Sequence, residues 1–191
     1  MKKKVALLLG ILALLALLAG AGALYDRMSA ENLPTENMAP AETQSAEEEE
    51  AEPVAAPDFT VLDAAGGEVR LSDFVGKPVV LNFWASWCGP CKSDMPEFET
   101  AYQEYGEDLH FMMGNLTDGS RETVESASEY IAGQGYTFPV FFDTEYNAAM
   151  AYGASSIPVT YFVDAEGYLT AYGRGALSGE ALQAGIDMLL P

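Results

Sequence analysis

The sequence predicts an α/β protein whose central mixed β-sheet is flanked by helices. The first observation is "VVLNFWA" at residues 79–85, a nearly continuous apolar run that is typical of a strand buried on both faces. The second is the alternation of strand-like and helix-like segments along residues 58–191. The third is the end of the chain, where two strands around a turn at Glu166-Gly167 precede a last helix. Such an order of elements favours a layered fold with parallel and antiparallel strands.

The predicted sheet begins with a hairpin and continues in further strands. Residues 59–71 alternate apolar and polar side chains around Gly66-Gly67, which favours two short strands joined by a turn. A second buried strand is predicted over 109–115. A third is predicted over 136–143, and because Pro139 lies inside it, we expect an edge position or a locally interrupted ladder.

A helix is predicted directly after the strand at 79–85. Pro90 suits the first turn of a helix, where its missing N–H group costs nothing. We expect this helix to reach about Tyr105 and to stop at Gly106, with a bend at Pro96.

A second helix is predicted over 120–135, with Ser120 as its N-cap and either Gly133 or Gly135 at its end. Two further helices are predicted over 144–153, closed by Gly153, and over 178–190.

The first 25 residues predict a signal anchor. Lysines 2–4 precede an uncharged apolar run from Val5 to Leu24, and twenty helical residues span roughly 30 Å, the thickness of a hydrocarbon core. The lysines keep the N-terminus in the cytoplasm, so the rest of the chain is exported. Small residues at 19–23 also suit signal cleavage, so secretion stays an alternative. No cysteine follows the run, which excludes a lipoprotein anchor.

Residues 26–57 predict an acidic, disordered tether before a single domain at 58–191. The segment is rich in Glu, Ala and Pro and has no aromatic residue, so it cannot bury enough surface to offset the entropy of ordering. The whole chain carries a formal net charge of −20 at pH 7. Because this charge repels phosphate groups, we expect no nucleic-acid partner.

The only two cysteines, Cys88 and Cys91, lie at the predicted junction of strand and helix. A disulfide between them would close too short a loop to add much stability, so a chemical role is favoured. Free N–H groups at a helix start favour a thiolate at Cys88. Cys91, one turn further on, would be more buried and would resolve a mixed disulfide formed by Cys88. A zinc site needs about four ligands, and only His110 could join the two cysteines.

Two long segments carry a resemblance to a known family. "VVLNFWASWCGPCK" and "YTFPVFFDTEYNAAMAYGASSIPVTYFVDAEGYLTAYGRG", together with the apolar N-terminal run, resemble the membrane-anchored extracytoplasmic thioredoxins of the TlpA/ResA type. The resemblance implies a thioredoxin fold with an N-terminal β-hairpin at 59–71 and a central strand–helix insertion at about 118–142. It also implies a thiol–disulfide oxidoreductase that works through a redox-active Cys88–Cys91 disulfide, without a metal or another cofactor.

The same resemblance assigns roles around the two cysteines. Pro158, in "SSIPVT", matches a proline whose preceding peptide bond is cis, which leaves the backbone of Ile157 free to pair with a substrate. A trans proline that only begins a strand stays the alternative. Trp87 matches a tryptophan of the apolar docking surface, and Gly89 and Pro90 lie between the cysteines, where a substrate would also make contact.

Two positions differ from ordinary thioredoxins. These have a buried aspartate as proton acceptor where this chain has Asn82, and the resembling family has an acidic residue, usually glutamate, three positions after the second cysteine. Here that residue is Asp94, which would lie on the same side of the helix as Cys91. Burial would raise the pKa of Asp94 toward the range of a general base. A solvated Asp94 on the helix surface is the alternative.

Three further residues are interpreted as structural. Trp84 is expected in the core, Lys92 on the surface, and His110 in a buried strand far from the cysteines.

The direction of electron flow stays open in the sequence. The Gly-Pro pair between the cysteines is shared with thioredoxin, whose potential is about −270 mV, and this favours a reductant. The resemblance implies exported client proteins with disulfides, such as apocytochrome c, as partners, and a membrane thiol protein as electron donor. A disulfide-forming oxidase on the same fold is the alternative. A thiol peroxidase is less favoured, because it would need a threonine and a proline shortly before its cysteine, where this chain has "NFWASW". A copper chaperone is also less favoured, because it would need a histidine close to the cysteines and the only histidine is His110.

Overall fold

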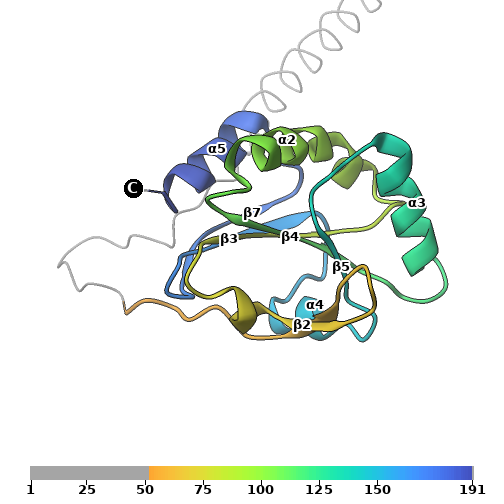
Figure 1. The fold of residues 1–191 in the computed structure, drawn as a ribbon, viewed down its shortest axis with the longest axis horizontal. Coiled ribbons are helices and arrows are strands. Elements are labelled where there is room, and N and C mark those ends of the chain that lie inside the picture. Colours follow the sequence, from red (N-terminus) through yellow and green to blue (C-terminus); the bar gives the residue numbers. More distant parts are fainter. Residues whose placement is uncertain (1–51, 191) are drawn as a thin grey trace, which may run out of the picture. The chain divides into compact units, whose positions relative to one another are not determined.

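The fold is built on one seven-stranded mixed β-sheet (Figure 1). The computed structural model describes residues 52–190. The strand order is β2-β1-β5-β4-β3-β6-β7. The strands are β1 (Thr60–Leu62), β2 (Glu68–Arg70), β3 (Val79–Trp84), β4 (His110–Asn115), β5 (Val140–Phe142), β6 (Val159–Val163) and β7 (Leu169–Arg174). The helices are the 3-10 helix η1 (Leu71–Phe74), α2 (Gly89–Tyr105), α3 (Val124–Gln134), α4 (Asn147–Ala151) and α5 (Gly179–Asp187).

The central strand β3 brings the site to one edge of the sheet. It runs parallel to β4, and β4 runs parallel to β5, whereas the other neighbouring strands are antiparallel. The register places Trp84, at the end of β3, opposite Asn115, at the end of β4. The segments after these two strands therefore leave the sheet at the same edge, and the first of them leads to the cysteines.

Helices cover both faces of the sheet, which confirms the predicted α/β class. All six residues of β3 are buried, because alternate side chains point to opposite faces and both faces are covered. Val80 and Trp84 pack in the cluster under α2 and α5. Leu81 and Phe83 pack on the other face with α4 and the N-terminal hairpin. Figure 1 shows α2 and α5 together on one side of the sheet and α4 on the opposite side.

The helix predicted over 120–135 begins later than expected. Thr123, and not Ser120, is the N-cap of α3. Its hydroxyl oxygen accepts a hydrogen bond from the backbone N–H of Ser126 at 3.1 Å, and the Ser126 hydroxyl accepts one from the N–H of Thr123 at 2.9 Å. This reciprocal pair satisfies two N–H groups at the helix start, which Ser120 alone could not do. Gly135, with φ of 75°, ends the helix as a left-handed cap.

Pro139 directly precedes β5 and does not interrupt it from within. The strand lies between β1 and β4, so the predicted edge position is wrong. The carbonyl oxygen of Pro139 accepts a hydrogen bond from the N–H of Met113 at 3.3 Å, because proline keeps its acceptor although it lacks a donor. The ladder between β5 and β4 runs without a break over Val140–Phe142, so the predicted interruption at Pro139 is not observed within the strand.

The predicted anchor, residues 1–25, and most of the predicted tether lie outside the described residues. Between residues 52 and 190, no helix is both long and apolar enough to cross a bilayer. The carbonyl oxygen of Val54 accepts a hydrogen bond from the N–H of Leu169 at 2.8 Å. The last residues of the predicted tether therefore pair with the beginning of β7, and the domain boundary at 58 stays a prediction.

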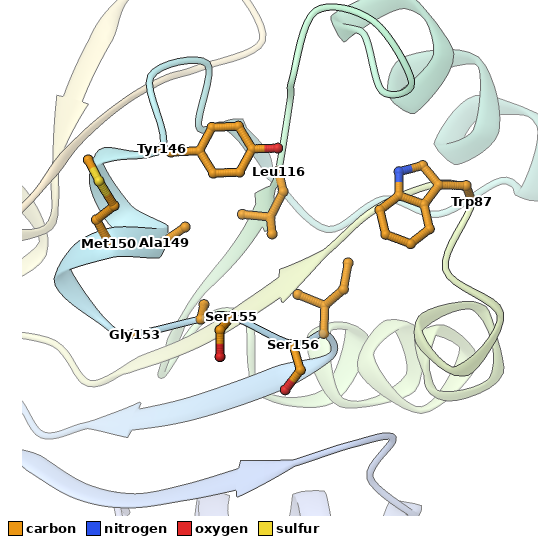
Figure 2. A pocket seen from close by; sticks show the side chains of 10 residues that line it. Trp87, Leu116, Tyr146, Ala149, Met150, Gly153, Ser155 and Ser156 are labelled. Atoms are coloured by element: carbon orange, nitrogen blue, oxygen red, sulfur yellow. The ribbon is translucent and has the colours of Figure 1, made fainter.

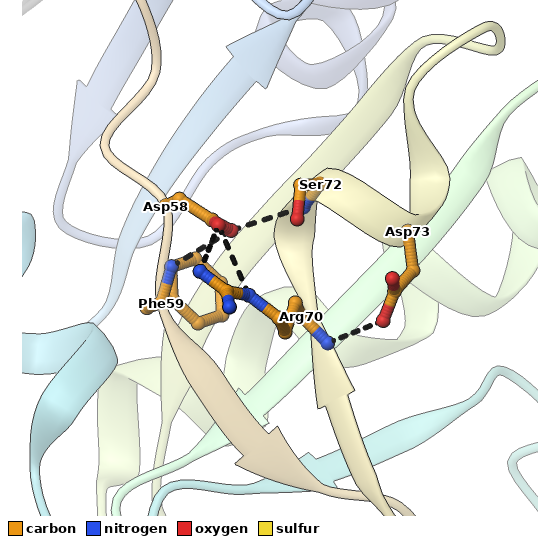
Figure 3. A network of polar contacts seen from close by, with 5 residues as sticks. All are labelled: Asp58, Phe59, Arg70, Ser72 and Asp73. Carbon is orange, nitrogen blue, oxygen red and sulfur yellow. Dashed lines mark hydrogen bonds and ion pairs between the residues drawn. The ribbon is translucent and has the colours of Figure 1, made fainter.

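A polar network around Asp58 fastens the start of β1 to the hairpin (Figure 3). One carboxylate oxygen accepts a hydrogen bond from Arg70 Nη2 at 2.7 Å, and the two groups form an ion pair. The other oxygen accepts bonds from the backbone N–H groups of Phe59 and Ser72 at 3.0 Å each. The network is open to solvent, since the side chains of Arg70 and Asp58 stay 60% and 35% exposed.

Candidate active site

Cys88 and Cys91 form a disulfide at the start of α2, with an S–S distance of 2.03 Å. Cys88 is the N-cap residue, and its sulfur accepts a hydrogen bond from the backbone N–H of Cys91 at 3.2 Å. Gly89 and Pro90 occupy the first helical positions, where the missing N–H of proline leaves no bond unmade. The free N–H groups and the positive end of the helix dipole therefore lie at the Cys88 sulfur, and both stabilise a thiolate there.

The two cysteines differ in solvent exposure, and Cys91 is the more buried of the two, as the sequence predicts. Cys91 is fully buried, whereas Cys88 keeps 4% of its surface exposed. The Cys88 sulfur lies 3.7 Å from the carbonyl oxygen of Ile157. The peptide bond between Ile157 and Pro158 is cis, as the resemblance implies. A partner disulfide can therefore approach only Cys88, past the loop that ends at Pro158.

The other predicted docking residues surround Cys88 at the surface. Gly89 and Pro90 are exposed, and the Trp87 side chain is 41% exposed. The guanidinium carbon of Arg121 lies 3.7 Å from the centroid of the Trp87 ring, within the range of a cation–π contact. Arg121 comes from the segment before α3, so this part of the insertion supports the indole beside the cysteines.

Asp94 is buried inside the fold, so the solvated alternative is wrong. Its side chain is 2% exposed, and its Oδ2 accepts a hydrogen bond from the backbone N–H of Leu177 at 3.2 Å. Burial raises the pKa of Asp94 to about 7, and the bond from Leu177 offsets only part of this effect. Asp94 lies one helical turn after Cys91, and both are on the buried side of α2. A carboxyl group with this pKa can exchange a proton with a thiol near neutral pH.

The residues interpreted as structural occupy structural positions. Asn82 is buried, and its Nδ2 donates a hydrogen bond to the Thr160 hydroxyl oxygen at 3.0 Å. Trp84 is fully buried in the core. His110 packs edge-on against Phe74, with ring centroids 4.9 Å apart. Because Asn82 is an amide, it cannot accept a proton, and Asp94 is the buried carboxyl group on α2.

Glu122 lies beside the cysteines without any signal in the sequence that predicts it. It is fully buried, and its carboxylate accepts hydrogen bonds from the N–H (2.7 Å) and hydroxyl (2.6 Å) of Ser86 and from Asn115 Nδ2 (2.7 Å). Three such bonds offset the cost of burying the charge. Glu122 thereby holds the loop before Cys88 against the end of β4. No periodicity marks it in the sequence, because it lies in a turn just before α3.

A groove of about 610 Å³ lies beside the cysteines (Figure 2). Trp87 and Ile157 line the end next to Cys88, and Tyr146 and Met150 line the end at α4. Figure 2 shows the Leu116 side chain between Tyr146 and Trp87. Trp87 and Ile157 were predictable from the sequence, but Tyr146 and Met150 were not, since their position beside the cysteines depends on the folded chain.

Among residues 52–190, no group of three or more His, Cys, Asp or Glu side chains is placed to hold a metal ion. The residues that the structure does bring together are two thiol groups, one buried carboxyl group and an apolar surface. Two thiol groups beside a helix start are the groups that thiol–disulfide exchange uses.

The chain matches known proteins over most of the described residues. The model of the AhpC/TSA family matches residues 54–172. The thiol-disulfide oxidoreductase ResA of Geobacillus thermodenitrificans is 32% identical over 136 residues, which cover 71% of this chain and 76% of that protein. Among solved structures, the exposed lipoprotein thioredoxin Etrx1 of Streptococcus pneumoniae is 32% identical with a TM-score of 0.59, covering 68% of this chain and 98% of Etrx1.

StoA of Bacillus subtilis has the same fold, with a TM-score of 0.60 at 23% identity, over 70% of this chain and 99% of StoA. The fold and the paired cysteines thus define a thioredoxin-like thiol–disulfide oxidoreductase. More narrowly, the chain belongs to the AhpC/TSA family, within which it is similar to ResA.

Proposed function

We propose that this enzyme reduces disulfides in exported client proteins on the outer side of the cytoplasmic membrane. The observation that carries the proposal is the arrangement at the start of α2, where Cys88 keeps 4% of its surface exposed beside the exposed Gly89, while Cys91 is fully buried and Asp94 is 2% exposed. A reductant needs one thiolate that a client can reach, a second thiol that the client cannot reach, and a group that takes the proton of the second thiol. Cys88, Cys91 and Asp94 fit these three roles.

The reaction proceeds in two exchange steps. The Cys88 thiolate attacks one sulfur of the client disulfide, so a mixed disulfide forms and the other client sulfur leaves as a thiolate. Cys91 gives its proton to Asp94 and attacks the Cys88 sulfur, which breaks the mixed disulfide and releases the client's second thiolate. The client gains two electrons, and its two thiolates take up one proton from Asp94 and one from water, the latter equal to the proton that Cys88 lost to water when it ionised. The enzyme is left with the Cys88–Cys91 disulfide.

The proposed location rests on residues outside the described part of the chain. The apolar run from Val5 to Leu24, preceded by lysines, acts as a signal anchor that leaves the domain at 58–191 outside the cell membrane. Residues 26–57 form the tether. The similarity to an exposed lipoprotein thioredoxin supports an extracytoplasmic location. Secretion after cleavage of the N-terminal segment is the alternative.

Two kinds of partner follow from the reaction. The first is an exported protein that contains a disulfide, because each turnover consumes one. The second is a membrane thiol protein that reduces the Cys88–Cys91 disulfide again, since the exported domain has no contact with cytoplasmic reductants. The two thiols carry both electrons, so no cofactor is needed.

The reduction potential of the Cys88–Cys91 pair tests the proposed direction. The purified full-length protein is equilibrated in dithiol and disulfide buffers, and tryptophan fluorescence follows the change because Trp87 adjoins the pair. We expect a potential near or below about −230 mV, as in reducing thioredoxins. Cys91→Ser, which cannot form the disulfide, is the control and should show no transition. A potential above about −150 mV would identify an oxidant and overturn the proposal.

A further inference from the structure

We propose that the groove beside Cys88 selects client segments that carry a large apolar side chain next to the reacting cysteine and a basic side chain beyond it. The groove runs from Trp87 and Ile157 to Tyr146 and Met150 on α4. This inference rests on the proposed function and names the substrate class of the same site.

The groove is continuous with the place where a client must react. Trp87 directly precedes Cys88, and the carbonyl oxygen of Ile157 lies 3.7 Å from the Cys88 sulfur. Both residues also line the groove. An extended polypeptide advances about 3.3 Å per residue, so the residues next to a cysteine bonded to Cys88 come within reach of the groove. The occupant is therefore the client chain itself.

The lining of the groove suits a large apolar side chain. Leu116, Ala149 and Met150 line it, and Met150 is 70% exposed without a client. A flexible methionine adapts to apolar side chains of different shapes. The volume of about 610 Å³ lies within the range of about 300–1,000 Å³ found for sites that enclose drug-sized ligands. One or two large side chains of a client would remove this apolar surface from water.

Tyr146 is held in an unusual backbone conformation at the far end of the groove. It has a φ of 59°, and among residues 52–190 it is the only residue other than glycine with a positive φ. Large side chains rarely adopt this conformation, and strained residues concentrate at functional sites. Figure 2 shows its ring on the groove side of α4, facing Leu116. The conformation thus serves to present an aromatic ring to the groove.

Acidic side chains lie near Tyr146, although none of them lines the groove. Burial, followed by the negative charges of Asp118, Asp143 and Glu122, raises the pKa of Tyr146. Glu145 is exposed beside it, and the whole chain has a formal net charge of −20. Such a field attracts a basic side chain and repels an acidic one. A client with the order cysteine, apolar residue, basic residue therefore fits the groove from Cys88 outward.

The test compares disulfide-linked peptides that differ only beside the cysteine. Full-length enzyme, kept reduced, is mixed with peptides carrying Cys-Leu-Lys, Cys-Ser-Lys or Cys-Leu-Glu, and the second-order rate of disulfide reduction is measured. Hydroxyethyl disulfide, which has no side chain for the groove, gives a baseline rate for each enzyme. We expect the Leu-Lys peptide to react about tenfold faster than the Ser-Lys peptide. The Leu-Glu peptide should react several-fold more slowly than Leu-Lys, and added salt should reduce this difference.

Matched methionine variants locate the selection in the groove. Met150→Ala should lower the Leu-Lys rate, relative to its own baseline, by at least about threefold. Met188→Ala is the control, because Met188 is also exposed (54%) but lies at the end of α5 and does not line the groove. Tyr146→Ala should act like Met150→Ala, with Tyr172→Ala (43% exposed, on β7) as its control.

Several outcomes would overturn the inference. Equal rates for the Leu-Lys and Ser-Lys peptides would show that the groove does not prefer an apolar side chain. Equal rates for the Leu-Lys and Leu-Glu peptides would show that it does not prefer a basic side chain. Variants of Met150 and Met188 that behave alike would place the selection elsewhere. Peptide rates per enzyme molecule that fall as enzyme concentration rises would show that a second copy of the chain occupies the groove. A wild-type enzyme that does not reduce hydroxyethyl disulfide would instead overturn the proposed function.

Discussion

The redox site and the N-terminal hairpin each contain an aspartate, and the protein surrounds the two in opposite ways. Asp94 at the redox site is 2% exposed and accepts a backbone hydrogen bond from Leu177. Asp58 in the hairpin region is 35% exposed and pairs with Arg70 in the only ion pair formed within residues 52–190. Burial raises the pKa of Asp94 to about 7. Burial also acts on Asp58, but bonds from Ser72 and Arg70 outweigh it and lower the pKa of that carboxyl group.

This difference separates a carboxyl group that can exchange protons from one that only fastens the chain. Asp58 keeps its charge over the whole neutral range, because the charge is what its donors bind. Asp94 has few donors and little water, so its charged and neutral forms are close in free energy near pH 7. The carboxyl group that is costly to bury therefore lies one helical turn after Cys91.

The largest expected difference between the two aspartates is the effect of Asp94 on the pH dependence of the free energy of unfolding. The folded-state pKa of Asp94, about 7, lies above the value of 3.8 expected when it is exposed. The contribution of Asp94 to the free energy of unfolding should therefore be most favourable below about pH 4 and should decrease as the pH rises to about 7. The loss is about 1.4 kcal/mol per pH unit, roughly 4 kcal/mol in all. Asp94→Asn should remove this dependence, as measured by urea unfolding of the oxidised protein between pH 4 and pH 8.

The comparison with Asp94→Asn isolates the group, because burial also raises the pKa of Asp143 and adds a slope of the same sign. The free-energy difference between wild type and variant should grow in favour of the variant from pH 4 to pH 7 and then stay constant. A difference that is the same at pH 5 and pH 8 would contradict the pKa of about 7.

The second effect is on the rate of the exchange. Asp94→Asn should slow the release of a client peptide from its mixed disulfide with Cys88 by roughly 10²-fold at pH 7, because Cys91 then lacks its proton acceptor. Stopped-flow fluorescence of a labelled peptide measures this step. Asp94→Glu should recover part of the rate, and Asp58→Asn is the control that should leave it unchanged. A release rate in Asp94→Asn equal to that of the wild type would assign the proton to another acceptor.

The smallest effect concerns the hairpin and has the opposite sign with pH. Asp58→Asn should cost at most about 1 kcal/mol at pH 7, because exposed ion pairs are well solvated and add little. Since the pKa of Asp58 is lowered in the folded protein, this stabilisation is present above about pH 4 and is lost as pH falls below it. Urea unfolding at pH 7 and pH 3 measures it, with Glu68→Gln on the same hairpin as control. A loss above about 2 kcal/mol would show that the network does more than fasten β1.

The sheet and helices were predictable where the signal is local. The continuous apolar run of β3, the Gly-Pro start of α2 and the stop at Gly106 each act on neighbouring residues, and the structure has these elements where they are predicted. Errors occurred where two local signals compete, as at Ser120 and Thr123, or where the position of a strand depends on distant partners. The edge position expected for β5 is such a case, because β1, from the other end of the domain, pairs with it.

In the candidate site, too, features set by neighbouring residues were predictable, and features that depend on distant residues were not. The roles of Cys88 and Cys91 follow from two cysteines at a helix start, and the sequence alone determined which of them is the more buried. Glu122 could not be found in this way, because it binds Ser86, which is 36 residues away in the chain.

By itself, the sequence determined the α/β class, the redox pair and which of the two cysteines is the more buried. These features depend on residue spacing, helix signals and apolar runs, which act between residues close together in the chain. Only the tertiary structure decided that Asp94 is buried, since its cover comes from Leu177, 83 residues further on. Only the tertiary structure brought Tyr146 and Met150 to the groove beside Trp87. Burial and grooves arise between elements, and the free energies that shift a pKa or select a side chain depend on which distant segments exclude water there.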